Sequence, residues 1–188
     1  MSRNIYFHSM IAAFVLLTSL PISTIAQSSV PQNQESGGAH KFTFGLGHAY
    51  FAEKESGAKN VAVNAYVLNY DYVINKHWSI GSHNDLLIEG RTEKLGTSAF
   101  YSTERPMVVK AMGLYSPFKN SHFMFGLGDE INRTHNNLII NLGLDYGFPI
   151  AEGWEVAGEI SFDNKIHGID SWIVGFGICK TIRKHHKS

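Results

Sequence analysis

Residues 138–148, LIINLGLDYGF, decide the fold of this chain. Every second residue is apolar, and small or polar residues such as Asn141, Gly143 and Asp145 stand between them. This period of two predicts a β-strand, because a helix would repeat its apolar positions every ~3.6 residues. One face of the predicted strand is formed by Leu138, Ile140, Leu142, Leu144, Tyr146 and Phe148.

Seven further segments are predicted strands: residues 41–47, 61–74, 77–89, 107–118, 122–131, 154–163 and 171–178. In residues 61–74 the apolar phase changes from odd to even positions, so a β-bulge is expected there. Short connections fall at residues 75–77, 117–121 and 149–153, and longer or more polar ones at 52–60, 90–105, 132–137 and 163–168. Such an alternation is typical of an up-and-down antiparallel barrel of eight strands.

The chemistry of the two strand faces separates a soluble barrel from a membrane barrel. A soluble barrel or sandwich hides its apolar face, whereas a membrane barrel is apolar outside and polar inside. Small residues suit the narrow interior of eight strands. We therefore predict an all-β, eight-stranded antiparallel transmembrane β-barrel with a polar, side-chain-filled interior. The small residues on the polar faces include Gly45, Gly47, Gly126, Gly128, Gly143, Gly147, Gly175 and Gly177.

Aromatic residues lie beside the predicted short connections. In a membrane barrel they would form a girdle at the membrane interface, and in a soluble barrel they would be ordinary hairpin-end aromatics. They are Tyr72, Trp78, Tyr115, Phe118, Phe123, Tyr146, Phe148 and Trp154.

The ends of the chain differ from its middle in composition. Arg3, an apolar run and Thr24-Ile25-Ala26 predict a signal peptide over residues 1–26 that is cleaved after Ala26. Residues 27–39 predict a disordered linker, residues 40–182 the barrel, and residues 183–188 a basic tail. The net charge is zero and the single cysteine is Cys179, so neither nucleic acid as a partner nor an intrachain disulfide is expected.

Five short segments carry a resemblance to a known family: FTFGLG at 42–47, WSIG at 78–81, FMFGLG at 123–128, GWEV at 153–156 and WIVGFG at 172–177. Over residues 40–182 the chain resembles small eight-stranded outer-membrane proteins of Gram-negative bacteria, especially short barrels of Bacteroidetes-type genomes. The resemblance implies export through the periplasm to the outer membrane. Its implied partners are outer-membrane lipid, lipopolysaccharide, the barrel-assembly machinery and an unidentified extracellular ligand. One departure is the C-terminus, where such barrels usually end on an aromatic residue and this chain ends on a basic tail.

Side chains alternate between the two faces of a strand, so the odd or even position of a residue (its strand parity) predicts whether it points into the barrel. By this rule, several charged residues point inward. Because an unpaired buried charge is costly, we expect these residues to form one interior ionic network, while an acid/base or cation site is the alternative. In particular, Lys110 and Glu130 or Glu159 are expected to form part of this one network and to close the lumen. We expect no cofactor and no metal. The predicted network consists of Asp85, Glu89, Arg105, Lys110, Glu130, Asp145, Glu155 and Glu159.

Two functions remain open from the sequence. The first is a non-enzymatic outer-membrane barrel with a structural or surface-interaction role, and a pore is disfavoured because eight strands leave no aqueous channel. The second is a lipid-modifying enzyme, since His77-Trp78-Ser79 resembles the His-x-Ser element of lipid A deacylases. Such an enzyme would draw on loop-end groups, which here are His135, Ser102, Glu89 and Arg105. His83, Asp85 and Glu89 share a face and form a weak metal-ligand candidate.

Overall fold

The computed structural model describes residues 38–51, 61–88, 93–95, 98–100, 105–131, 136–166 and 168–183 of the 188-residue chain. The predicted signal peptide, most of the predicted linker and residues 184–188 of the tail lie outside the described residues, as do Glu89, Ser102 and His135. Among the residues that are described, no helix is long and apolar enough to cross a membrane.

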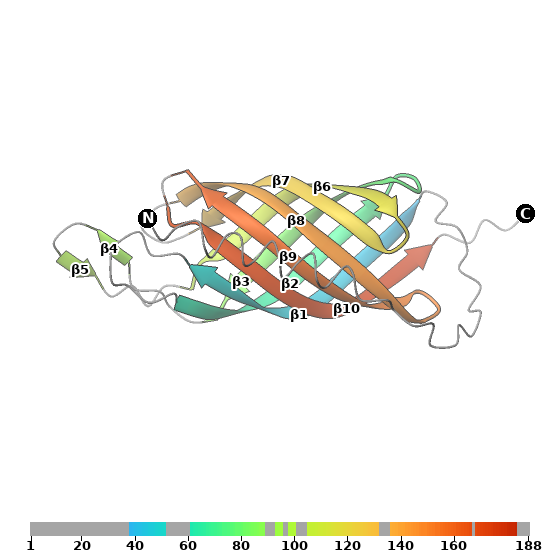
Figure 1. Ribbon diagram of the computed structural model, residues 1–188, viewed down its shortest axis with the longest axis horizontal. Coiled ribbons are helices and arrows are strands. Elements are labelled where there is room, and N and C mark those ends of the chain that lie inside the picture. The colour runs from blue at the N-terminus through green and yellow to red at the C-terminus, as the bar shows by residue number, and fades with distance from the viewer. Residues whose placement is uncertain are drawn as a thin grey trace, which may run out of the picture. The chain divides into compact units, whose positions relative to one another are not determined.

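Eight strands close into a single antiparallel barrel, in the order β1-β10-β9-β8-β7-β6-β3-β2, with β2 also paired to β1 (Figure 1). The predicted eight-stranded barrel is thus confirmed. Two short strands, β4 (Glu93–Leu95) and β5 (Ser98–Phe100), form a hairpin within the connection from β3 to β6, where the sequence predicted only a loop. The barrel strands are β1 (Ala39–Phe51), β2 (Val61–Val73), β3 (Trp78–Leu87), β6 (Met107–Phe118), β7 (Ser121–Ile131), β8 (Asn136–Ala151), β9 (Trp154–Lys165) and β10 (Ser171–Arg183).

The connections alternate between the two ends of the barrel. The β2–β3, β6–β7 and β8–β9 connections are tight turns at the end where β10 finishes, which we call the short-turn end (Figure 1). In the first turn, Asn75 Oδ1 accepts hydrogen bonds from the backbone N–H groups of His77 (2.9 Å) and Trp78 (3.0 Å). The other two turns use left-handed residues, Asn120 (φ 67°) and Gly153 (φ 68°). The strand ends that the longer connections join lie at the opposite end, which we call the loop end.

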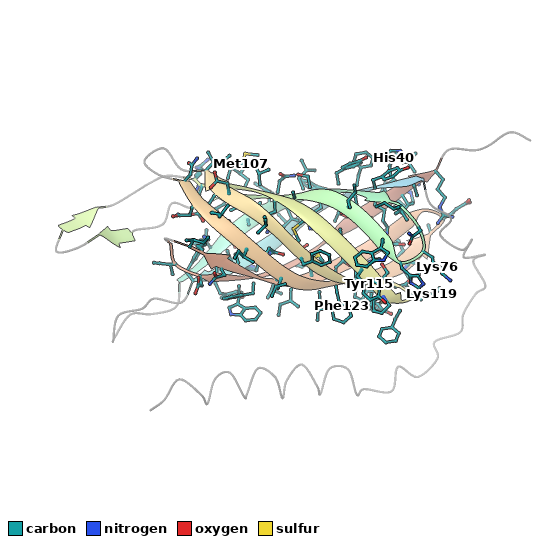
Figure 2. The ribbon with its side chains drawn as sticks, turned by 90° about the horizontal axis from the view of Figure 1, so that it is seen from above. His40, Lys76, Met107, Tyr115, Lys119 and Phe123 are labelled. Carbon is teal, nitrogen blue, oxygen red and sulfur yellow. The ribbon has the colours of Figure 1, made fainter. Side chains whose placement is uncertain are left out.

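The two faces of the barrel wall have opposite chemistry. Side chains point outward all around the barrel wall (Figure 2). The large apolar ones among the exposed residues include Phe44, Leu142 and Phe176, which are 61%, 59% and 65% exposed. Polar and charged side chains such as Lys110 and Glu130 are buried inside. A soluble barrel would bury the first group and expose the second. The aromatics that flank the short turns also lie on the outside, as the girdle arrangement requires.

Strand β2 does not contain the bulge predicted from its sequence. Its odd-numbered residues face inward from Val63 to Val73, and its register with β1 and β3 is continuous. The apparent change of phase arises because Val63, Ala65 and Val67 are buried inside the barrel, so the inner face of this part of β2 is apolar too. Register shifts occur instead between Tyr115 and Phe118, and between Pro149 and Ala151. The inner face near the loop end forms an apolar cluster of Ala49, Phe51, Val63, Ala65, Leu87 and Ile173.

Candidate functional site

The middle of the lumen is organised around Lys110 on β6. Its Nζ donates a hydrogen bond to Asp85 Oδ2 on the neighbouring strand β3 at 2.7 Å. Across the lumen, the same Nζ lies 3.7 Å from Asp163 Oδ1 on β9. Asn141 Nδ2 also donates to Asp163 Oδ1, at 2.6 Å. All four side chains are buried, so this cluster joins four strands through charge-assisted contacts that water does not screen.

A second ion pair lies closer to the loop end. Glu130 on β7 is completely buried and pairs with Lys165 Nζ on β9. Asn137 on the intervening strand β8 donates to the other carboxylate oxygen of Glu130 at 3.4 Å. Lys165 Nζ also lies 4.9 Å from the centre of the Phe51 ring. Phe51 belongs to the apolar cluster, which covers the ion pair on its loop-end side. Both charges are therefore held away from solvent by a layer of apolar side chains.

The third group of charges lies toward the short-turn end. His83 Nε2 lies 3.0 Å from Asp71 Oδ1, and Lys41 Nζ lies 3.4 Å from Glu155 Oε2. Gly81 makes room for the first pair, because a Cβ at that position would collide with Asp71 Oδ1. A glycine on the inner face thus has a direct packing reason, which is the approach of a neighbouring carboxylate.

Asp145 and Glu159 face each other directly across the β8–β9 register. Glu159 Oε2 accepts a hydrogen bond from Asn69 Nδ2 at 3.2 Å, across the lumen from β2. Both carboxylates line a cavity of about 10 Å³, which is room for about one water molecule. A second cavity of about 10 Å³ lies nearer the short turns, between Asp145, His122 and Cys179. Each of these two cavities is water-sized, with side chains of the lumen around it.

The residues predicted for the interior network have different outcomes. Six of them face the lumen, and Glu89 lies outside the described residues. Arg105 is a correction: it is exposed and precedes β6, where even-numbered residues such as Val108 and Lys110 point inward and odd-numbered ones point outward. The structure pairs Lys110 with Asp85 rather than with Glu130 or Glu159. The six lumen residues are Asp85, Lys110, Glu130, Asp145, Glu155 and Glu159.

Four members of these pairs are absent from the predicted network: Lys41, Asp71, Asp163 and Lys165. Strand parity contained the signal for two of them, because Asp163 and Lys165 continue the inward face of Glu159 along β9. The predicted strand ended at residue 163, so Lys165 was counted as part of a loop. Asp71 was not recognised because the expected bulge left the inward face of β2 undefined.

Of the residues proposed for hydrolytic chemistry, the described pair His77 and Ser79 does not come together. His77 is exposed in the β2–β3 turn, where its Nδ1 lies 3.1 Å from the Ser116 carbonyl oxygen. Ser79 is buried inside the barrel. His83, the metal-ligand candidate, contacts Asp71 rather than Asp85. Within the described part of the chain, no group of three His, Cys, Asp or Glu side chains is placed to hold a metal ion.

Solved structures with the same architecture include three bacterial outer-membrane proteins. The attachment invasion locus protein Ail of Yersinia pestis has a TM-score of 0.54 and 12% identity, covering 78% of this chain and 99% of Ail. The N-terminal β-barrel domain of Pseudomonas aeruginosa OprF has a TM-score of 0.54 and 11% identity, covering 78% and 98%. OprG from the same organism has a TM-score of 0.53 and 10% identity, covering 79% and 98%.

These similarities show that the chain has the fold of small eight-stranded outer-membrane barrels. No protein-family model matches the sequence, and no curated protein matches it. The likeness to barrels of Bacteroidetes-type genomes stays a prediction.

Proposed function

We propose that this protein is a non-enzymatic barrel of the outer membrane, with a closed interior and a structural or surface-interaction role. The observation that carries the proposal is the pairing of an apolar outer surface with a lumen filled by ion pairs. The first feature requires a lipid environment. The second supports a closed interior, because eight strands enclose a space that side chains can fill and the two cavities described above are water-sized.

The outer surface supports the membrane location. A single side chain such as Leu142 or Phe176 gains about 1.5–3 kcal/mol when it is fully transferred from water into an apolar environment. Outward apolar residues occur on every strand of the barrel, so an aqueous location would expose a very large apolar area. The predicted signal peptide supports export, and the short turns would then face the periplasm.

The filled lumen supports a role that resides on the surface of the protein. The ion pairs of Lys110, Lys165 and Lys41 lie at three levels of the barrel, and two water-sized cavities lie among the side chains of the lumen. The long connections at the loop end would face the outside of the cell. Ail, which shares this fold, forms a complex with the heparin analogue sucrose octasulfate, and this supports a surface-binding role.

Three measurements test the proposal on the full chain. After cell fractionation, the protein should stay in the outer-membrane pellet through an alkaline carbonate wash, and release by that wash would refute the location. In planar bilayers it should add no defined conductance steps, and reproducible steps would refute the closed lumen.

The mass spectrum of lipid A should be the same with and without the protein. A loss of acyl chains would instead support the enzymatic alternative.

A further inference from the structure

A patch of aromatic side chains covers the outside of three neighbouring strands at the short-turn end. Trp78 on β3 lies 4.9 Å from Tyr115 on β6 and 6.3 Å from Phe125 on β7, measured between ring centres. Phe118 and Phe123 extend the patch, and all five rings are exposed. Figure 2 shows Tyr115 and Phe123 at this end of the barrel. We call these five residues the turn-end aromatic patch.

Two lysines border this patch, one from each of the adjacent turns. Lys76 lies in the β2–β3 turn and Lys119 in the β6–β7 turn, and both are exposed (Figure 2). The two turns are tied together, because Ser116 N donates to the His77 carbonyl at 2.8 Å and His77 Nδ1 lies 3.1 Å from the Ser116 carbonyl. The two lysines therefore extend from two hydrogen-bonded turns at the edge of the apolar surface.

Neither lysine has a hydrogen bond or ion pair to any residue that the structure describes. Carboxylates are absent from the local sequence, since residues 72–84 and 105–128 contain no Asp or Glu. Lys180, at the same end of the barrel, differs: its Nζ donates to the Glu152 carbonyl at 3.4 Å and lies 4.6 Å from the Trp154 ring centre. The positive charge of Lys76 and Lys119 is thus available to a partner from outside the protein.

We propose that Lys76, Lys119 and the turn-end aromatic patch bind an anionic phospholipid in the leaflet next to the short turns. Trp and Tyr rings prefer the headgroup level of a bilayer, and lysines above them extend their amines toward the phosphates. The lipid phosphate would lie between the two amines, with an acyl chain along the aromatic rings. This inference rests on the proposed membrane location. A basic side chain near a membrane surface raises the affinity for anionic lipid about fivefold.

The test uses Trp78 as the reporter in the full chain carrying Trp154→Phe and Trp172→Phe. The barrel is reconstituted into phosphatidylcholine vesicles that contain a small fraction of brominated phosphatidylglycerol or, separately, of phosphatidylcholine with the same brominated chains. Quenching of Trp78 then reports the local concentration of each lipid. Heat-modifiable migration on gels confirms folding for every variant, and the chain with all three tryptophans is measured alongside.

We expect phosphatidylglycerol to associate near Trp78 at least about fivefold more strongly than phosphatidylcholine, and less so at high salt. Lys76→Gln with Lys119→Gln should bring the ratio close to one. The matched control Lys180→Gln should keep the ratio, because the amine of that lysine already donates to the Glu152 carbonyl, a contact that Trp154→Phe leaves in place.

Equal quenching by the two lipids, or an unchanged ratio in the double variant, would overturn the inference while leaving the membrane location intact. Quenching by neither lipid in a folded protein would instead refute the location, and the inference with it.

Discussion

Replacement of Lys110 by Met tests whether the ion pairs of the lumen hold the barrel closed. Lys110 is 3% exposed, and its amine contacts Asp85 at 2.7 Å and Asp163 at 3.7 Å. The substitution removes the cation that contacts both of these buried carboxylates. Asp163 Oδ2 has no hydrogen-bond partner among the described residues even in the intact cluster. Leaving a buried charge without its partner costs about 3–5 kcal/mol, so we expect the free energy of unfolding to fall by about that amount.

The assay is reversible urea unfolding of the barrel in lipid vesicles, followed by tryptophan fluorescence. The double variant Lys110→Met with Asp85→Leu removes the charge and its nearest partner together, and should recover at least about half of the loss. Lys180→Met, near the barrel rim, serves as the control and should change the unfolding free energy by less than about 1 kcal/mol. Equal and mild effects of the single and double lumen variants would show that these side chains are solvated, and would refute the closed-lumen argument.

Three further changes test other parts of the structure. Leu142→Arg, near the middle of the outer face of β8, should lower the unfolding free energy by about 2–4 kcal/mol in the same assay, and a neutral result would indicate a water-facing surface. Gly81→Ala should cost about 1–3 kcal/mol because the new Cβ would collide with Asp71, whereas Gly158→Ala meets no atom within 4 Å and should change little. Protease added to intact cells should spare the basic tail, and its rapid loss without permeabilisation would reverse the proposed orientation.

The strands could be predicted from the sequence because most of them differ in polarity between their two faces. β8 is the clearest case, since Asn141, Gly143 and Asp145 alternate with large apolar residues. The bulge predicted in β2 was wrong. Val63 and Val67 line the lumen there, and Val63 belongs to the apolar cluster near the loop end. There both faces are apolar, so parity carries no information. The β4–β5 hairpin was missed because its strands are only three residues each.

The partners of the buried charges could not be predicted from strand parity. Strand parity predicts which side chains point into the lumen. Which of these side chains contact one another depends on the stagger and curvature of the barrel. Lys110 on β6 reaches Asp163 on β9, although two strands lie between them in the sheet. Likewise, Lys165 and Glu130 pair across the intervening strand β8. These contacts depend on three-dimensional closure, which no local sequence spacing encodes.

The way the ring closes has a consequence for how the chain folds. Every barrel strand pairs with its neighbours along the chain, β4 and β5 aside, except at the seam where β1 meets β10. Hairpins join residues close in sequence, whereas this seam brings Ala39 against Arg183. The seam is also tightly packed, since a Cβ on Gly45 would lie 2.5 Å from the Phe176 carbonyl oxygen. Long-range contacts form late because their loop-closure entropy must be overcome first. Until β10 arrives, β1 and β9 each present an unpaired edge, so a nascent or truncated chain is a template for pairing with another copy.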